Sequence, residues 1–190
     1  VKFPLKKKSD EFLIIWTTTP WTIPFNLAVM VGPEIEYVKI QVGKEKWIVA
    51  KELKEKLLSL LATEAKVVEE FKGKKLEGVE YSHPFEKLIP LNTELKKKHP
   101  NVHTVILSKE FVDTSAGTGL VHSAPGCGPE DQEACKPYNI PPFNPIAENG
   151  IFPSAMGSFA GLRAKLNDHQ FIEALEKEGY RVEAVEGGGA

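Results

Sequence analysis

The chain has 190 residues, 42% of them hydrophobic, so it can bury a core the size of one domain. Its 24 basic and 26 acidic residues give a formal net charge of -2, which excludes a general electrostatic attraction to nucleic acid and leaves only local RNA contacts. The apolar runs are too short for a transmembrane helix, and no hydrophobic stretch typical of a signal peptide follows the lysine-rich start. We expect a soluble, cytoplasmic, monomeric protein without a membrane partner.

The cysteine content predicts neither a disulfide framework nor a metal site. Cys127 and Cys135 are eight positions apart, and no second pair of cysteines matches the spacing of a zinc ribbon. We therefore expect no metal and no cofactor.

The chain ends suggest a fragment of a larger protein. The sequence begins with valine and ends in the run Gly-Gly-Gly-Ala, so residues 187–190 are interpreted as a tail or a cloning remnant. We expect residues 1–186 to form a single domain.

Hydrophobic periodicity predicts mostly strands in the first half of the chain. The strands are expected at residues 11–16, 27–31, 37–42, 47–50 and 67–71. The second, third and fourth of these are expected to form a β-meander, with a hairpin at Gly43-Lys44. Residues 51–61 switch to a helical period, with leucines on one face.

The second half contains more turn-forming residues. Residues 78–90 predict loops and short edge strands, and both lysine triplets, residues 6–8 and 96–98, are interpreted as solvated surface. The remaining expected elements are strands at 102–107, 120–124 and 180–185, helical turns at 130–136 and a helix from Asn167 to Gly179, with Asn167 as N-cap and Gln170 completing a capping box.

Residues 16–26 form the first candidate site. They read Trp-Thr-Thr-Thr-Pro-Trp-Thr-Ile-Pro-Phe-Asn and directly follow a predicted strand. The hydroxyl and amide groups offer many short hydrogen-bonding groups, while Pro20 and Pro24 are expected to prevent a helix. A stiff, polar segment of this kind at a strand end indicates a binding site.

A second cluster extends from Gly117 to Asp131. Gly117-Thr118-Gly119 allows close approach to a ligand, His122 lies on a predicted strand, and Asp131 can hold an ammonium group as a carboxylate. The two clusters could face each other across one pocket. Equally, His122 could be a structural histidine, and Asp131 could only favour the dipole at a helix start.

Two other site classes receive less support. A covalent hydrolase could use one of Thr17 to Thr19, Ser123 or Cys127 with His122 as base, but the sequence lacks a glycine-flanked nucleophile elbow. The Gly-Thr-Gly run lacks the third glycine and the lysine of nucleotide-binding loops.

Together, the run at residues 16–26 and the run Gly-Thr-Gly-Leu-Val-His-Ser-Ala-Pro-Gly at 117–126, followed by Asp131, closely resemble the editing domain of isoleucyl-tRNA synthetase. The resemblance covers about residues 1–185. It implies a mainly β fold of α+β character, a small closed β-barrel with peripheral helices. It also implies hydrolysis of valine from the 3′ adenosine of tRNA for isoleucine, a double-sieve function for which this synthetase is the standard example.

The resemblance also assigns roles to residues. It implies catalytic roles for Asp131, Thr17, Thr19 and His122, and substrate-binding roles for Thr18, Trp21, Thr22, Asn26, Gly117, Thr118 and Ala124. Asp131 would hold the α-amino group, and the threonines would position the ester and the attacking water. The group that accepts the proton is left open, because no adjacent base is obvious.

The implied partners are mischarged tRNA and the remainder of the synthetase chain. Because the ATP-binding signatures of the synthetase are missing, the chain should not aminoacylate tRNA. A module that binds the aminoacyl end without hydrolysis is the main alternative.

Overall fold

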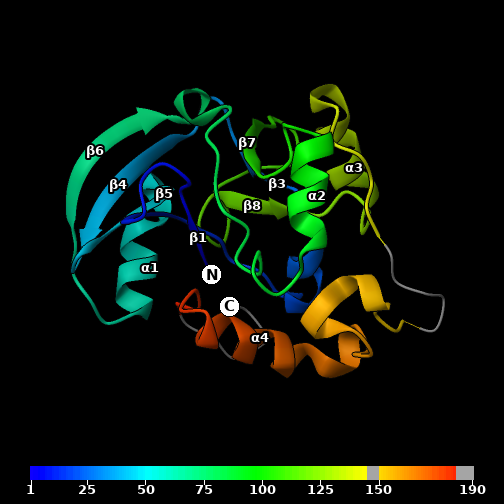
Figure 1. Cartoon of the computed structure of the whole chain (residues 1–190). Coiled ribbons are helices and arrows are strands. Elements are labelled where there is room, and N and C mark those ends of the chain that lie inside the picture. Colours follow the sequence, from blue (N-terminus) through cyan, green and yellow to red (C-terminus); the bar gives the residue numbers. More distant parts are fainter. Residues whose placement is uncertain (145–149, 183–190) are drawn as a thin grey trace.

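The computed structural model describes residues 1–144 and 150–182, which form an α+β fold with two mixed sheets and peripheral helices. In Figure 1 the sheets lie side by side, with α1 next to the first sheet and α2 and α3 next to the second. The first sheet has the order β1 (Lys2–Pro4), β2 (Glu11–Ile14), β5 (Glu45–Ala50), β4 (Glu36–Val42), β6 (Lys66–Lys72). The second has the order β7 (Thr104–Leu107), β3 (Ala28–Val31), β8 (Leu120–Ser123).

The first sheet is built on the predicted hairpin. Strands β4 and β5 pair antiparallel from Tyr37↔Ala50 to Val42↔Glu45, and Gly43 has the positive φ of +60° that a tight two-residue turn requires. Strand β2 then pairs parallel with β5, and all four of its residues are buried. The sheet thereby directs the end of β2 toward the threonine run.

The second sheet is centred on β3, which pairs parallel with β7 and antiparallel with β8. All four residues of β3 are buried because both faces of the strand are covered. Val29 and Val31 belong to the main core, whereas Ala28 and Met30 pack into a smaller cluster that includes Cys135 of α3. The continuous apolar run of this strand reflects burial on both faces.

Two predictions about sheet topology were wrong. Strand β3 does not continue into β4 as a meander, because the two strands lie in different sheets. The described strands also form no closed barrel: within residues 1–144 and 150–182 no strand of one sheet pairs with a strand of the other, and the segment at residues 80–81 forms only the isolated bridges Leu5↔Tyr81 and Glu80↔Thr104. The nearby prolines at 84 and 90 have no N–H group, so this connecting segment does not extend into a strand.

Three of the four described α-helices lie where the sequence predicts them. These are α1 (Lys54–Leu60), α3 (Pro129–Cys135) and α4 (Asp168–Lys177). Helix α2 (Leu91–Lys98) was missed, because its apolar face consists only of the partly buried Leu91 and Leu95, and its one buried residue is the polar Asn92. Lys96 of this helix was predicted to be a solvated surface side chain. Its Nζ instead donates hydrogen bonds to the carbonyls of Pro100 (2.6 Å) and Val102 (2.7 Å).

The threonine run continues into a 3-10 helix, η1 (Pro20–Phe25), which the prolines were expected to prevent. Pro20 is compatible with a helix start, where its missing N–H group would have no partner. Five further 3-10 helices in the described residues connect the other elements: η2 (Lys51–Leu53), η3 (Gly73–Leu76), η4 (Lys136–Tyr138), η5 (Ser154–Phe159) and η6 (Lys165–Asn167).

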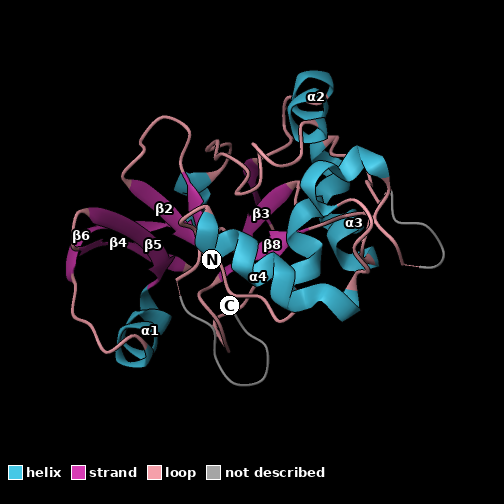
Figure 2. Ribbon diagram, turned by 60° about the horizontal axis from the view of Figure 1, so that its bottom comes forward, coloured by secondary structure: helices cyan, strands magenta, loops and turns pink. Residues whose placement is uncertain are grey.

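Helix α4 packs against η1 and anchors it. Phe171 is buried, and its ring lies 5.3 Å from that of Phe152, which in turn lies 5.1 Å from that of Phe25. Asp168 Oδ1 also accepts a hydrogen bond from the Trp21 amide at 3.2 Å. Figure 2 shows α4 running in front of the region between the two sheets.

Two predictions about the end of the chain need correction. Asn167 occupies the N-cap position, but its side chain makes no capping bond, because its Oδ1 accepts from the Arg163 amide at 2.7 Å. Residues 180–182 are not a strand, although the Tyr180 carbonyl accepts a bond from the Lys2 amide. The rest of the strand predicted at 180–185 and the proposed tail at 187–190 lie outside the described residues.

Gly119 is predicted to be essential for joining the two sheets. Its φ is +80°, and an added Cβ would lie 2.4 Å from Ala50 Cβ. Gly119→Ala should therefore lower the free energy of unfolding by about 2–4 kcal/mol, from backbone strain plus overpacking. The control Gly43→Ala, at φ +60° with no atom within 4 Å of the added Cβ, should cost only about 1 kcal/mol in urea denaturation. Equal losses for both variants would contradict the prediction.

Candidate functional site

A cavity of about 490 Å³ lies where the end of β2, η1, β8 and the start of α3 meet. It is lined by Trp16, Thr17, Thr18, Thr19, Trp21, Thr22, Phe111, Asp113, Ser115, Ala116, Gly117, Thr118, Gly119, Leu120, Val121, His122, Ala124, Cys127 and Asp131. The structure thus brings the two sequence clusters together. Of the predicted site residues, only Asn26 does not line the cavity, and it lies behind His122.

The threonines form one wall of the cavity. Thr17 is largely buried, and its Oγ1 accepts a hydrogen bond from the Thr19 amide at 3.1 Å, which turns the chain tightly. Thr18 and Thr19 are exposed to the cavity side. The Oγ1 atom of Thr19 lies 3.4 Å from that of Thr17 and 3.5 Å from that of Thr22. Three hydroxyl groups from one short segment are thereby gathered beside one another.

His122 faces this wall from β8. Its Nε2 lies 2.9 Å from Thr22 Oγ1, and its Nδ1 lies 2.7 Å from Asn26 Nδ2. An amide nitrogen can only donate, so Nδ1 is the acceptor and the ring proton is on Nε2. Nε2 therefore donates to Thr22 Oγ1, and the Thr22 hydroxyl donates to the Thr19 carbonyl at 2.8 Å.

The charge state of His122 follows from its surroundings. Burial lowers its pKa to about 4, so the ring is neutral at physiological pH. With Nδ1 accepting from Asn26 and Nε2–H donating to Thr22, neither nitrogen is free to accept a proton from water. The geometry suits a residue that holds Thr22 and shapes the cavity wall.

Asp131 lies in the first turn of α3, which begins at Pro129. Its Oδ2 accepts a hydrogen bond from the Ala124 amide at 3.0 Å. Burial raises the pKa of this carboxyl, and the Ala124 bond only partly opposes the effect. Within residues 1–144 and 150–182 no salt bridge to Asp131 forms, so a cation entering the cavity would supply a missing charge partner.

The glycine loop closes the other side. Gly117 and Gly119 both have positive φ, and Trp16 packs against Gly117, where an added Cβ would lie 3.4 Å from the tryptophan. The Thr118 hydroxyl donates to the Ile14 carbonyl at 2.6 Å, and the Thr118 carbonyl accepts from the Ala50 amide at 2.8 Å. Thr118 therefore ties the loop to β2 and β5.

The thiols are poorly suited to act as nucleophiles. Burial, with a smaller effect of Asp131, raises the pKa of Cys127 to about 12, and burial raises that of Cys135 to about 11. Both thiols stay protonated. Among the described residues no group of three His, Cys, Asp or Glu side chains is arranged to hold a metal ion.

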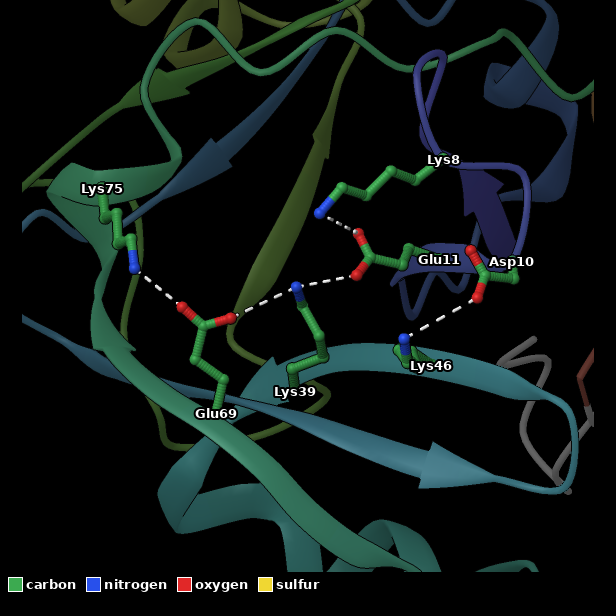
Figure 3. A network of polar contacts seen from close by, with 7 residues as sticks. All are labelled: Lys8, Asp10, Glu11, Lys39, Lys46, Glu69 and Lys75. Atoms are coloured by element: carbon green, nitrogen blue, oxygen red, sulfur yellow. Dashed lines mark hydrogen bonds and ion pairs between the residues drawn. The ribbon is translucent and has the colours of Figure 1, made fainter.

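A second cavity, of about 570 Å³, lies beside the first sheet and has a different character. Figure 3 shows its charged side chains joined in a network, in which Lys39 Nζ lies 2.7 Å from Glu11 and 3.3 Å from Glu69. Lys8 and Lys75 extend the network from Glu11 and Glu69 respectively. Because these charges pair with one another, they stabilise the contact between β4, β6 and the N-terminal segment. None of the predicted site residues lines this cavity.

The fold is similar to that of a solved domain over most of its length. No family model matches the chain. The crystal structure described as GlLeuRS-CP1 is similar with a TM-score of 0.66, over 90% of this chain and 82% of that chain, at 17% sequence identity. This chain therefore shares the fold of that domain.

The sequence is similar to one segment of the isoleucine–tRNA ligases. The chain is 45% identical over 190 residues to the isoleucine–tRNA ligase of Pyrococcus horikoshii and 46% identical to that of Pyrococcus furiosus. Each match covers 98% of this chain but only 18% of the relative. The ligase of Methanocaldococcus jannaschii is 40% identical over 195 residues. The chain therefore corresponds to one segment of the isoleucine–tRNA ligases, the synthetase that the resemblance predicted.

Several residues at the cavity were not predicted. Phe111, Asp113 and Ser115 line it from the segment before the glycine loop, and only their closeness to Gly117 in sequence could have indicated them. Tyr81, behind Asn26, had no signal in the sequence.

None of the helices in the described part of the chain is long and apolar enough to cross a membrane.

Acid should destabilise the domain steeply. Burial lowers the pKa of His122 and His103 to about 4 and that of His83 well below its usual value. Below about pH 6.5 the unfolded chain binds protons at these positions and the folded chain does not. The free energy of unfolding should then fall by up to about 1.4 kcal/mol per pH unit for each histidine, and the loss should stop near pH 4 for His122 and His103.

Urea denaturation between pH 8 and pH 5 tests this prediction. These three groups contribute no slope above about pH 7, where they are neutral in both states. His122→Gln should remove about one third of the acid slope. A free energy of unfolding that is constant between pH 7 and pH 5 would show that the histidines are not held neutral.

Proposed function

We propose that this domain hydrolyses the ester bond of valine attached to the 3′ adenosine of tRNA for isoleucine. The observation that carries the proposal is the position of Asp131, a partly buried carboxylate that faces the threonine wall across one cavity. An aminoacyl ester carries an ammonium group beside its carbonyl carbon. Asp131 can pair with the ammonium group, and the threonine hydroxyls can bind the ester.

In this reaction a water oxygen forms a bond to the ester carbonyl carbon, and the bond from that carbon to the ribose oxygen breaks. The ribose oxygen leaves as a hydroxyl, and the water proton is transferred to it directly or through a neighbouring ribose hydroxyl. Asp131 holds the ammonium group, which fixes the carbonyl relative to Thr17, Thr19 and Thr22. The threonine hydroxyls position the ester and the water.

One part of the cavity wall sets the size of the accepted side chain. Trp21 and His122 form this part of the sieve, and the bonds of His122 to Asn26 and Thr22 keep its ring from turning away. The terminal nucleoside is held by other residues that line the cavity: Thr18, Gly117, Thr118 and Ala124. A side chain one methylene larger than valine is excluded by contact with this wall.

We further propose that the domain acts in the cytoplasm as part of a monomeric synthetase. The partners are then the 3′ end of mischarged tRNA and the remainder of the synthetase chain. The near-neutral charge of the domain means that the larger enzyme supplies most of the tRNA affinity.

Asp131→Asn should reduce hydrolysis of valyl-tRNA for isoleucine by about 100-fold, because the neutral amide no longer attracts the ammonium group. Glu130→Gln, an exposed neighbour on the same helix, is the matched control and should keep the rate. Release of labelled valine under single-turnover conditions measures both. Equal rates for Asp131→Asn and the unchanged chain would remove Asp131 from the mechanism.

The unchanged domain should hydrolyse valyl-tRNA at least about tenfold faster than isoleucyl-tRNA. One methylene is worth about 1–3 kcal/mol in an apolar pocket, a range for which this synthetase is itself the standard example. The comparison uses the same tRNA charged with each amino acid. If both esters are hydrolysed equally fast, the cavity is not a size sieve.

The binding-module alternative makes a different prediction. It requires a salt-dependent mobility shift with aminoacyl-tRNA, while the ester survives as long as in buffer alone. A covalent hydrolase would instead leave an acyl adduct on a threonine or Ser123, visible by mass spectrometry after rapid quenching.

A further inference from the structure

Tyr81 lies behind the cavity, in the segment that bridges the two sheets. Only 2% of its surface is exposed, and its ring lies 5.3 Å from that of Phe3 and 5.8 Å from that of His103. Its backbone pairs with Leu5 on one side, and its amide donates to the His103 carbonyl at 3.1 Å. The position of its hydroxyl is therefore fixed by the core.

That hydroxyl donates a hydrogen bond to Asn26 Oδ1. The direction is certain because a neutral amide oxygen can only accept. Burial raises the pKa of Tyr81 well above its usual value, so the hydroxyl keeps its proton and remains a donor. The other end of the Asn26 amide donates to the Ala28 carbonyl at 2.9 Å and to His122 Nδ1 at 2.7 Å.

These hydrogen bonds therefore form one chain from the core to the cavity, in which each residue donates to the next. Tyr81 donates to Asn26, Asn26 donates to His122, and His122 donates to Thr22, which donates to the Thr19 carbonyl. Each bond in such a chain polarises the next. If the ring proton moved to Nδ1, it would face the Asn26 amide hydrogen, and the Thr22 hydroxyl would turn toward His122 and release the Thr19 carbonyl.

We propose that Tyr81 is a positioning residue for the hydrolysis, fixing the Asn26 amide and thereby the Nε2–H form of His122. This inference rests on the proposed function of the cavity. Tyr81 touches no substrate and acts only through Asn26. Without its hydroxyl, Asn26 Oδ1 is a buried acceptor with no donor among the described residues, and the amide loses one of the contacts that orient it.

Tyr81→Phe tests the proposal, since it removes only the hydroxyl and keeps the ring packed against Phe3 and His103. The variant should lower kcat for valyl-tRNA hydrolysis about tenfold, with KM changed less than about twofold. Long-range 15N NMR at neutral pH, assigned with His122→Asn, should show one Nε2–H tautomer in the unchanged chain. The two ring-nitrogen shifts should move toward each other in Tyr81→Phe.

Tyr138→Phe is the matched control. Its hydroxyl donates to Glu77 at 2.8 Å and accepts from the Leu107 amide at 3.1 Å, outside the cavity, so this variant also loses a bonded tyrosine hydroxyl. It should keep both kcat and the His122 spectrum, with assays run where circular dichroism shows both variants folded.

The possible outcomes separate this inference from the proposed function. An unchanged kcat in Tyr81→Phe overturns it, and so does a lower kcat with an unchanged His122 spectrum, which would indicate a purely structural role. If the unchanged chain hydrolyses no aminoacyl ester, the proposed function fails. The NMR comparison then still decides whether Tyr81 sets the His122 tautomer, and an unchanged spectrum rejects it.

Discussion

The hydrogen bond between Asn26 and His122 joins the two halves of the cavity. Asn26 ends η1, whereas His122 lies on β8, 96 residues later in the chain. The backbone supports the same junction, because the Leu27 amide donates to the Ser123 carbonyl at 3.0 Å and Val29 pairs with His122 in the sheet register. The distance between the threonine wall and the histidine is therefore set by sheet pairing.

Asp131 is placed by the same strand. The chain leaves β8 at Ser123, and the next amide, that of Ala124, donates a hydrogen bond to the Asp131 carboxylate in the first turn of α3. The side chains of Ser123 and Cys135 also meet, with Oγ and Sγ 3.4 Å apart, which fixes the end of α3 against the strand. A single short strand thus orients both the imidazole ring of His122 and, at its end, the carboxylate of Asp131.

The sequence predicted best those features that depend on local pattern. The hairpin of β4 and β5 and the burial of Phe171 and Leu175 follow from residue periodicity, and the two motifs indicated most of the cavity lining. It predicted worst those features that depend on distant partners. Whether β3 pairs with β4 or with β7 is decided by contacts across the core, and the Tyr81 hydroxyl finds its acceptor 55 residues away. Asn167 failed as a cap because the Arg163 amide lies within reach of its side chain.

The bond between the Trp21 amide and Asp168 has a consequence for the order in which the domain matures. These residues are 147 positions apart, so the wall that carries Trp21 lacks this support until α4 has been synthesised. The ring of Phe25 likewise has no packing contact with Phe152 until that residue has been synthesised, and Phe152 has none with Phe171 until α4 follows. The threonine run is synthesised early, whereas helix α4, which supports it, is synthesised late. The cavity is thus completed near the end of translation of this segment, after both sheets have all their strands.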